Sequence, residues 1–132
     1  MIVVQEKKNI REISRSFING KFNQATMILE ILKNCKPIIQ ETNLVVLSKF
    51  LDKNFENGIP VTMTYMTPNG SNDVGDVDHY DKNSISIVMV GQKSQYDFPI
   101  SDIAKIYLIE HPRGTGFFCM GKRQNSIYLR DY

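Results

Sequence analysis

One stretch of the chain concentrates side chains of the kinds that bind metal ions. It holds four aspartates and one histidine within nine residues: Asp73, Asp76, Asp78, His79 and Asp81. Carboxylate oxygens are good ligands for calcium, but an EF-hand loop needs acids at alternate positions followed by a glycine. Asp76 and Asp78 fit this pattern, but Tyr80 and Asp81 stand where the third acid and the glycine should follow. On a strand, moreover, Asp78 and His79 would point to opposite faces. We therefore interpret the stretch as a solvated acidic strand edge and predict no metal site.

A second candidate site lies near the C-terminus, where glycines alternate with cations. The runs Arg113-Gly114-Thr115-Gly116 and Gly121-Lys122-Arg123 could bind a phosphate through exposed amides and positive charge, although they match neither a P-loop nor a dinucleotide-binding fingerprint. The neighbouring aromatic residues could stack on nucleobases or pad a hairpin against the core. The candidate contacts with a nucleic acid or a protein partner are Arg113, Phe117, Phe118, Lys122, Arg123 and Arg130.

The residue types that usually perform nucleophilic catalysis form no recognisable constellation. His79 and His111 have no nucleophile motif around them, and Cys35 and Cys119 lie in different segments without a Cys-x-x-Cys spacing. We expect no enzymatic activity, no catalytic residues and no cofactor. Free thiols, together with an N-terminal apolar run too short for a signal peptide or a membrane span, predict a cytoplasmic protein without a membrane partner.

Charge is unevenly distributed along the chain, although the net charge is only +2. Residues 1–22 hold five basic and two acidic residues, and residues 111–132 hold four basic and one acidic residue, so each end carries +3. Residues 23–110 hold seven basic and eleven acidic residues, a balance of −4. If the protein binds nucleic acid, the basic ends should make the contacts. The alternative is that the basic ends only maintain solubility.

The N-terminal part, residues 1–57, shows the spacing of helices. Apolar residues recur at helical intervals over residues 10–17 and again over residues 22–34, where Met27 and Ile31 widen the apolar face and could contact a partner helix. The clearest pattern follows Thr42 or Asn43, either of which can cap a helix. That helix is expected to end at Asn57-Gly58, and its apolar positions are Leu44, Leu47, Leu51 and Phe55.

After Gly58 the apolar period changes from 3.6 to 2, which indicates strands. Five short strands are expected over residues 61–66, 73–80, 84–89, 96–98 and 105–109, with tight turns between them and one helical turn at 100–103. This order predicts a five-stranded Sm-like or SH3-like barrel over residues 58–110. Residues 111–132 are predicted to form a basic C-terminal β-hairpin appended to the barrel. The whole chain is expected to be a single α+β domain with the N-terminal helices packed on the barrel.

Three segments give the chain a resemblance to a known family. They are KPIIQETNLVVLSKFLDKNFENGIPVTMTY at 36–65, GDVDHYD at 75–81, and the run from Ile100 to Ile106. Together they resemble the YolD-like proteins of bacteria and their phages. The resemblance implies an Sm-like barrel, no catalytic residues, and a role in regulating a Y-family translesion polymerase. Residues 111–132 depart from the family pattern.

These observations lead to two expectations of function. The first is a non-enzymatic regulator, carried by a mobile element, that binds a Y-family polymerase or another host protein and acts in DNA repair. The alternative is a small nucleic-acid-binding protein that uses its basic termini. Self-association through exposed edge strands of the barrel is a third expectation.

Overall fold

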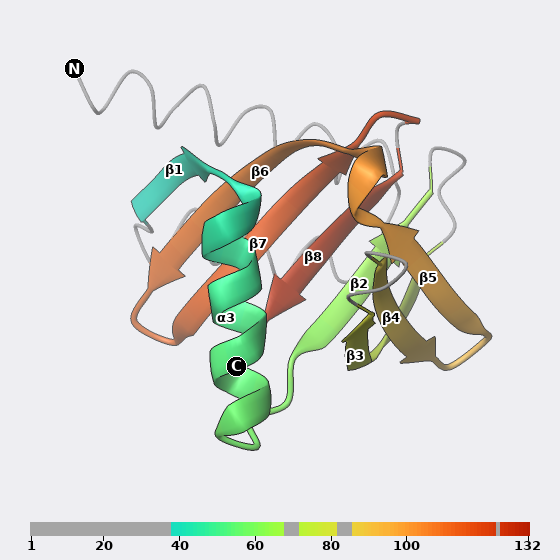
Figure 1. Cartoon of the computed structure of the whole chain (residues 1–132), viewed down its shortest axis with the longest axis horizontal. Helices are drawn as coiled ribbons and strands as arrows, with labels where there is room; N and C mark the ends of the chain where they lie inside the picture. Colours follow the sequence, from blue (N-terminus) through green and yellow to red (C-terminus); the bar gives the residue numbers. More distant parts are fainter. Residues whose placement is uncertain (1–37, 68–71, 82–85, 124) are drawn as a thin grey trace.

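The computed structural model describes residues 38–67, 72–81, 86–123 and 125–132. Within these ranges the chain forms one α-helix and an eight-stranded antiparallel sheet (Figure 1). In chain order the elements are β1 (Ile38–Thr42), α3 (Leu44–Glu56), β2 (Thr62–Met66), β3 (Asn72–Asp81), β4 (Ser86–Gly91), β5 (Gln95–Pro99), the 3₁₀ turn η1 (Ile100–Asp102), β6 (Ile103–His111), β7 (Gly114–Gly121) and β8 (Ser126–Arg130).

Helix α3 forms where the sequence predicts it. Asn43 caps it, because its side-chain oxygen accepts hydrogen bonds from the backbone N–H groups of Val45 at 3.0 Å and Val46 at 3.2 Å. The helix ends at Asn57, and Gly58 follows with a φ of 66°, a conformation that glycine adopts without strain. Figure 1 shows the helix lying across strands β6, β7 and β8.

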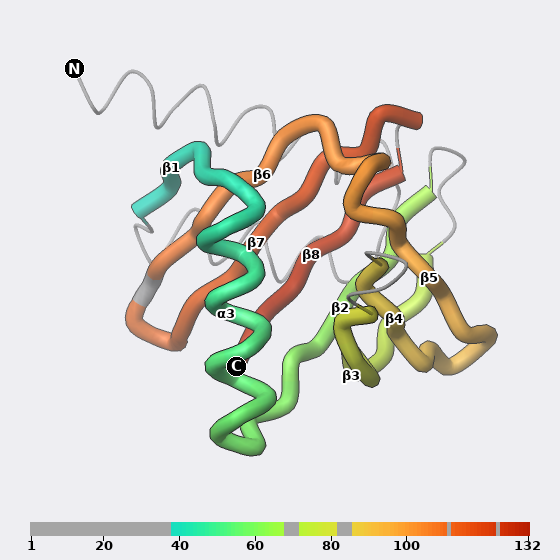
Figure 2. Tube along the Cα trace, in the orientation of Figure 1, coloured from blue at the N-terminus to red at the C-terminus, as the bar shows by residue number. Residues whose placement is uncertain are grey.

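The five strands predicted for a barrel are all present, but the barrel is not. The strand order is β1-β6-β7-β8-β2-β3-β4-β5, so β6 pairs with β7 and β2 pairs with β8. Closure of the predicted Sm-like or SH3-like barrel would require β6 to pair with β2, and the hairpin of β7 and β8 stands between them. Figure 2 shows the two outer strands, β1 and β5, on opposite sides of the molecule. The prediction of a closed five-stranded barrel is therefore wrong, and the fold is an open sheet.

The hairpin of residues 111–132 is correctly predicted as a hairpin and wrongly predicted as an appendage. Both of its strands carry apolar side chains on both faces, and a strand of this kind is stable only in the middle of a sheet. Six residues of β7 and β8 have side chains that are at most 1% exposed: Phe117, Phe118, Cys119, Ile127, Tyr128 and Leu129. Burial of these side chains is the physical reason why the hairpin enters the sheet and opens the barrel.

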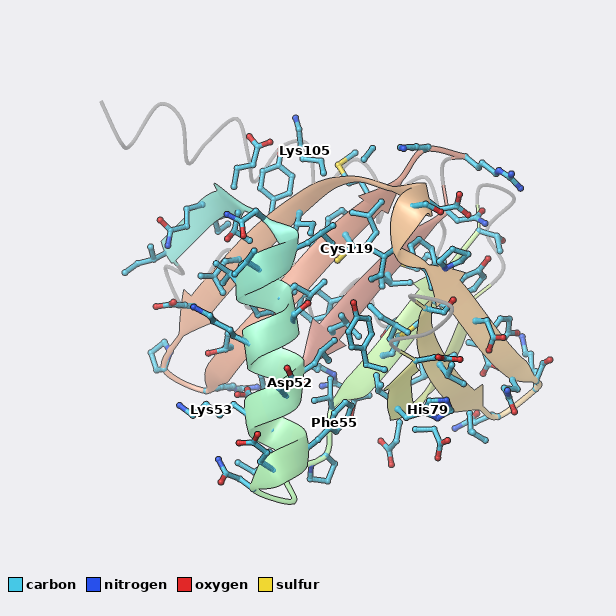
Figure 3. The ribbon with its side chains drawn as sticks, viewed as in Figure 1. Asp52, Lys53, Phe55, His79, Lys105 and Cys119 are labelled. Carbon is cyan, nitrogen blue, oxygen red and sulfur yellow. The ribbon has the colours of Figure 1, made fainter. Side chains whose placement is uncertain are left out.

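The core lies between α3 and the sheet face that it covers. Leu47 and Leu51 of the helix pack into this core, and the ring of Phe50 lies 4.7 Å from that of Phe117, centroid to centroid. Cys119 lies in the same core behind the helix (Figure 3).

The opposite face of the central strands is also buried, at side chains that include Tyr107 and Phe118. No helix within the described ranges lies on that face. The helices predicted over residues 10–17 and 22–34, with the candidate partner face at Met27 and Ile31, fall outside the described residues. Among the residues that the structure describes, no helix has the length and apolar character needed to cross a membrane.

Candidate functional site

The two phenylalanines predicted to contact a nucleic acid or a partner lie in the interior. Phe117 is 1% exposed and faces the core under α3, and Phe118 is fully buried on the opposite face of the sheet. Phe118 is paired with Tyr107 on β6 and with Tyr128 on β8. Neither phenylalanine can stack on a base in this structure, so of the two functions proposed for these rings only the packing function fits their positions.

The four predicted cations do not form one patch. Arg113 lies in the turn between β6 and β7, near Arg130 at the end of β8, because Gly116 pairs with Arg130. Lys122 and Arg123 lie in the turn between β7 and β8, at the other end of β7. The eight residues of β7 separate the two turns by roughly 25 Å at the usual rise of a strand. A ligand would have to span the length of the sheet to touch all four.

A notch interrupts the edge of the sheet where β1 ends. Strand β6 pairs with β7 from Ile103 to His111, but with β1 only from Ile106 to Glu110. Within the described ranges, residues 103–105 therefore have no strand on their β1 side, because the chain leaves the sheet after Thr42 to begin α3. A cavity of about 390 Å³ occupies this place; it is lined by residues 41–45 and 103–106. We call this feature the edge notch.

Two exposed apolar side chains, Leu44 and Val45, line the edge notch. Six large apolar residues of the described ranges are exposed, and four of them lie on β1 or the first turn of α3: Ile38, Leu44, Val45 and Val46, the other two being Ile59 and Val90. The N-cap bonds to Asn43 hold this first turn of the helix in place. Lys105 of β6 lies beside the start of α3 (Figure 3), with its ammonium 5.7 Å from the centroid of the Tyr107 ring. The notch thus combines the end of β6 that β1 does not cover with apolar walls.

A second cavity, of about 260 Å³, lies where β2, β3 and β5 meet. Its walls are Tyr65, Thr67, Asn72, Lys93 and Tyr96, and we call it the tyrosine pocket. The rings of Tyr65 and Tyr96 are stacked, 4.7 Å apart and inclined by 22°. The phenol oxygen of Tyr65 accepts a hydrogen bond of 2.9 Å from the Asn125 side chain. Burial raises the pKa of both tyrosines, and nearby aspartates raise it further, so both phenols are neutral at physiological pH.

A buried carboxylate fixes the turn that carries Lys93. Asp73 is 4% exposed and accepts hydrogen bonds from the backbone N–H groups of Val74 (2.9 Å), Gln92 (3.1 Å) and Lys93 (2.9 Å). Burial acts to raise the pKa of Asp73, but these three bonds and a fourth from the Tyr96 side chain outweigh it, so that the pKa is lowered. The ionised carboxylate therefore holds the turn between β4 and β5 against β3.

The remaining reactive groups of the described residues do not assemble into a site. His79 contacts Asp78 at 2.7 Å, and both side chains are more than half exposed. No group of three histidine, cysteine, aspartate or glutamate side chains in the described part of the chain could hold a metal ion. Burial raises the pKa of the Cys119 thiol, and a buried thiol of this kind is a poor nucleophile.

Comparison with known proteins gives no match: no family model, no curated protein and no solved structure is detectably similar to this chain.

No residue of the edge notch or of the tyrosine pocket is among the candidate site residues predicted from the sequence. Tyr65 comes from one segment of the chain and Lys93 and Tyr96 from another, and only strand pairing brings the two segments together. The notch arises because β1 is shorter than β6. The sequence carries one signal for it, the departure of the chain from extended structure at the cap residue Asn43.

Proposed function

We propose that this chain is a non-enzymatic protein-binding module that takes an extended segment of its partner into the edge notch. The observation that supports this proposal is the coincidence, at one place, of the end of β6 that β1 does not cover with the exposed side chains of Leu44 and Val45. Backbone pairing would supply affinity, and the apolar walls would select alternate side chains of the segment.

An extended segment suits the notch better than a helix does. The N–H and C=O groups along a free strand edge require hydrogen-bond partners when a ligand excludes water from them. A helix bonds its own backbone groups internally and would leave the edge of β6 unsatisfied. A strand that continues the line of β1 past Thr42 would pair with that edge, as β1 itself does from Ile106 onward.

The first partner to test is suggested by the resemblance to the YolD-like proteins, which points to a Y-family translesion polymerase and to a regulator carried by a mobile element. A second copy of this chain is the other candidate, because the outer edge of β1 is free of any strand among the described elements. Sizing at two protein concentrations separates these cases, since only self-association depends on the concentration of this chain.

The decisive experiment compares two matched surface substitutions. Val45 beside the notch is 62% exposed and Val90 on β4 is 54% exposed, so Val45→Glu and Val90→Glu should both leave stability nearly unchanged. Peptides are selected from a phage-displayed random library on the wild-type chain. The binding of these peptides, and of the polymerase, is then measured for the wild type and for both variants. We expect selected peptides with alternating apolar residues, whose affinity falls at least about tenfold in Val45→Glu and is retained in Val90→Glu.

Hydrogen exchange then tests the mode of binding. A bound strand should slow amide exchange at Ala104 and its neighbours, because it would cover the end of β6 that β1 leaves open. Peptides that bind both variants equally, or that slow exchange elsewhere while these residues stay unchanged, would refute the proposal.

A further inference from the structure

One cation, Lys93, lines the tyrosine pocket, and two more, Lys122 and Arg123, lie in the turn that leads to Asn125, a residue bonded to Tyr65. The Lys93 ammonium donates a hydrogen bond of 3.3 Å to the backbone oxygen of Asn72, at the wall of the pocket. Lys122 and Arg123 are exposed in the turn between β7 and β8. None of the three forms a salt bridge with another residue in the described part of the chain. Their positive charge is therefore available to a ligand.

The turn that carries two of these cations is fixed next to the pocket. The backbone N–H of Gly121 donates to the oxygen of Asn125, at 2.6 Å, and the N–H of Lys122 donates to the oxygen of Asp102, at 2.7 Å. The side chain of Asn125 in turn donates to the phenol oxygen of Tyr65. The chain at the end of this turn thus contacts Tyr65, and Lys122 and Arg123 lie three and two residues before the contacting Asn125.

Two carboxylates lie near the aromatic pair, Asp102 near Tyr65 and Asp73 near Tyr96, and the one in contact with the pair does not cancel this charge. Asp73 is hydrogen-bonded to Tyr96 and to three backbone N–H groups, so its negative charge is offset by four donors within the protein. The pocket is lined by the two tyrosines together with Asn72 and Thr67. Aromatic rings that contact bases, amides that bond base edges and cations that hold phosphates are the groups that bind unpaired nucleotides.

We propose that the tyrosine pocket, together with Lys93, Lys122 and Arg123, binds single-stranded nucleic acid. An unstacked base enters the pocket against Tyr65 and Tyr96, and the flanking phosphates lie on the cations. A cavity between two strands and a turn admits a single base that has left its stack, whereas a base held in a duplex cannot enter it. Cations on two different turns match several phosphates in a strand better than the phosphate of one nucleotide.

The test is fluorescence anisotropy of the full chain with labelled oligothymidylate and oligouridylate of about 12 nucleotides at about 50 mM salt. Tyr96→Ala should weaken binding about tenfold, because it removes a stacking ring. Tyr96→Phe keeps the ring and loses only the hydroxyl that bonds Asp73, so it should bind like the wild type. This pair separates a loss of stacking from a loosened turn.

Charge is tested with a matched set of lysine substitutions. Lys93→Gln and Lys122→Gln should each lower the slope of log affinity against log salt by about 0.7, the value for one phosphate contact on a single strand. Lys53→Gln, at an exposed position near the far end of α3 (Figure 3), should leave the slope unchanged.

Four results would overturn the assignment: no binding of either oligomer, equal loss of affinity in Tyr96→Ala and Tyr96→Phe, equal slopes in all three lysine variants, or equal affinity for a duplex of the same sequence. Competition by a free mononucleotide at the same concentration as the oligomer would also overturn it, since the site would then take one nucleotide and not a strand.

Discussion

Replacing the buried carboxylate of Asp73 should destabilise the protein more than any substitution at its surface. Asp73→Asn keeps the size of the side chain but removes its charge, and an amide group then faces backbone N–H donors that need an acceptor. The affected donors are those of Val74, Gln92 and Lys93. We expect the turn between β4 and β5 to detach from β3, with the loss concentrated there.

The magnitude follows from the number and kind of bonds. A hydrogen bond to a charged group contributes about 1.5–3 kcal/mol, and leaving a donor unsatisfied costs a similar amount. Gln92 and Lys93 are exposed, so water can accept some of the hydrogen bonds that their N–H groups no longer donate to residue 73. We therefore expect a loss of about 2–4 kcal/mol in the free energy of unfolding, and a fall in Tm of roughly 10 °C for a chain of this length.

The effect should depend on pH in a defined direction. The pKa of Asp73 is lowered in the folded protein, so its ionised form contributes stability above the unfolded pKa of about 3.9 and loses it as pH falls through the folded value. The stability gap between wild type and Asp73→Asn should thus be full near neutral pH and shrink below about pH 4. Urea unfolding at several pH values measures it, with Asp97→Asn on the exposed part of β5 as the control. A gap that is no larger than that of the control, or that is the same at all pH values, would refute this account.

Four other predictions test the packing and the two proposed surfaces. Gly116→Ala would place a Cβ 2.7 Å from the Cζ of buried Tyr128, so we expect a loss of about 1–3 kcal/mol in urea unfolding; an unchanged midpoint would show that the ring moves freely. Asn43→Ala removes the cap of α3 and should cost about 1 kcal/mol, measured in the same way. Val45→Glu, with Val90→Glu as control, should abolish peptide binding at the edge notch. In the tyrosine pocket, Lys93→Gln should lower the salt dependence of oligonucleotide binding.

The sequence predicts the individual elements of this fold because each depends on local patterns. The cap at Asn43 and the apolar spacing after it define α3. Alternation marks strands such as β2 and β5, whereas β6 is marked by the unbroken apolar run at residues 106–109. The choice of partner for β6 does not depend on a local pattern. It depends on whether β7 or the distant strand β2 forms the more stable pair with β6. A resemblance to a barrel-forming family favoured closure, and nothing local to residues 58–110 contradicted it.

One signal in the sequence did point to the true topology. The runs Phe117–Met120 and Ile127–Leu129 are apolar without alternation, which is typical of strands buried on both faces. This signal favours the second of the two interpretations of Phe117 and Phe118, packing of the hairpin against the core, over contact with a ligand. The pairing of Tyr65 with Tyr96 had no comparable signal, because 30 residues of chain separate the two and each belongs to an ordinary strand pattern.

The insertion of β7 and β8 accounts for both proposed surfaces. It separates β6 from β2, so the other edge of β6 is left to the short strand β1, and the notch is the part of that edge that β1 does not reach. It also places the basic turn at Lys122 beside Tyr65. Because Ile103 pairs with Gly121, the notch and the basic turn lie at the same end of the sheet, on adjacent strands about 4.8 Å apart. A segment bound at the notch would lie beyond β6, two strand spacings or about 9.6 Å from β7. At low salt, where the Debye length reaches about 30 Å, Lys122 and Arg123 would favour acidic residues beside the apolar ones in that segment. A nucleic acid on the same turn would oppose such a segment, and because linkage between two ligands is reciprocal, each would weaken the other.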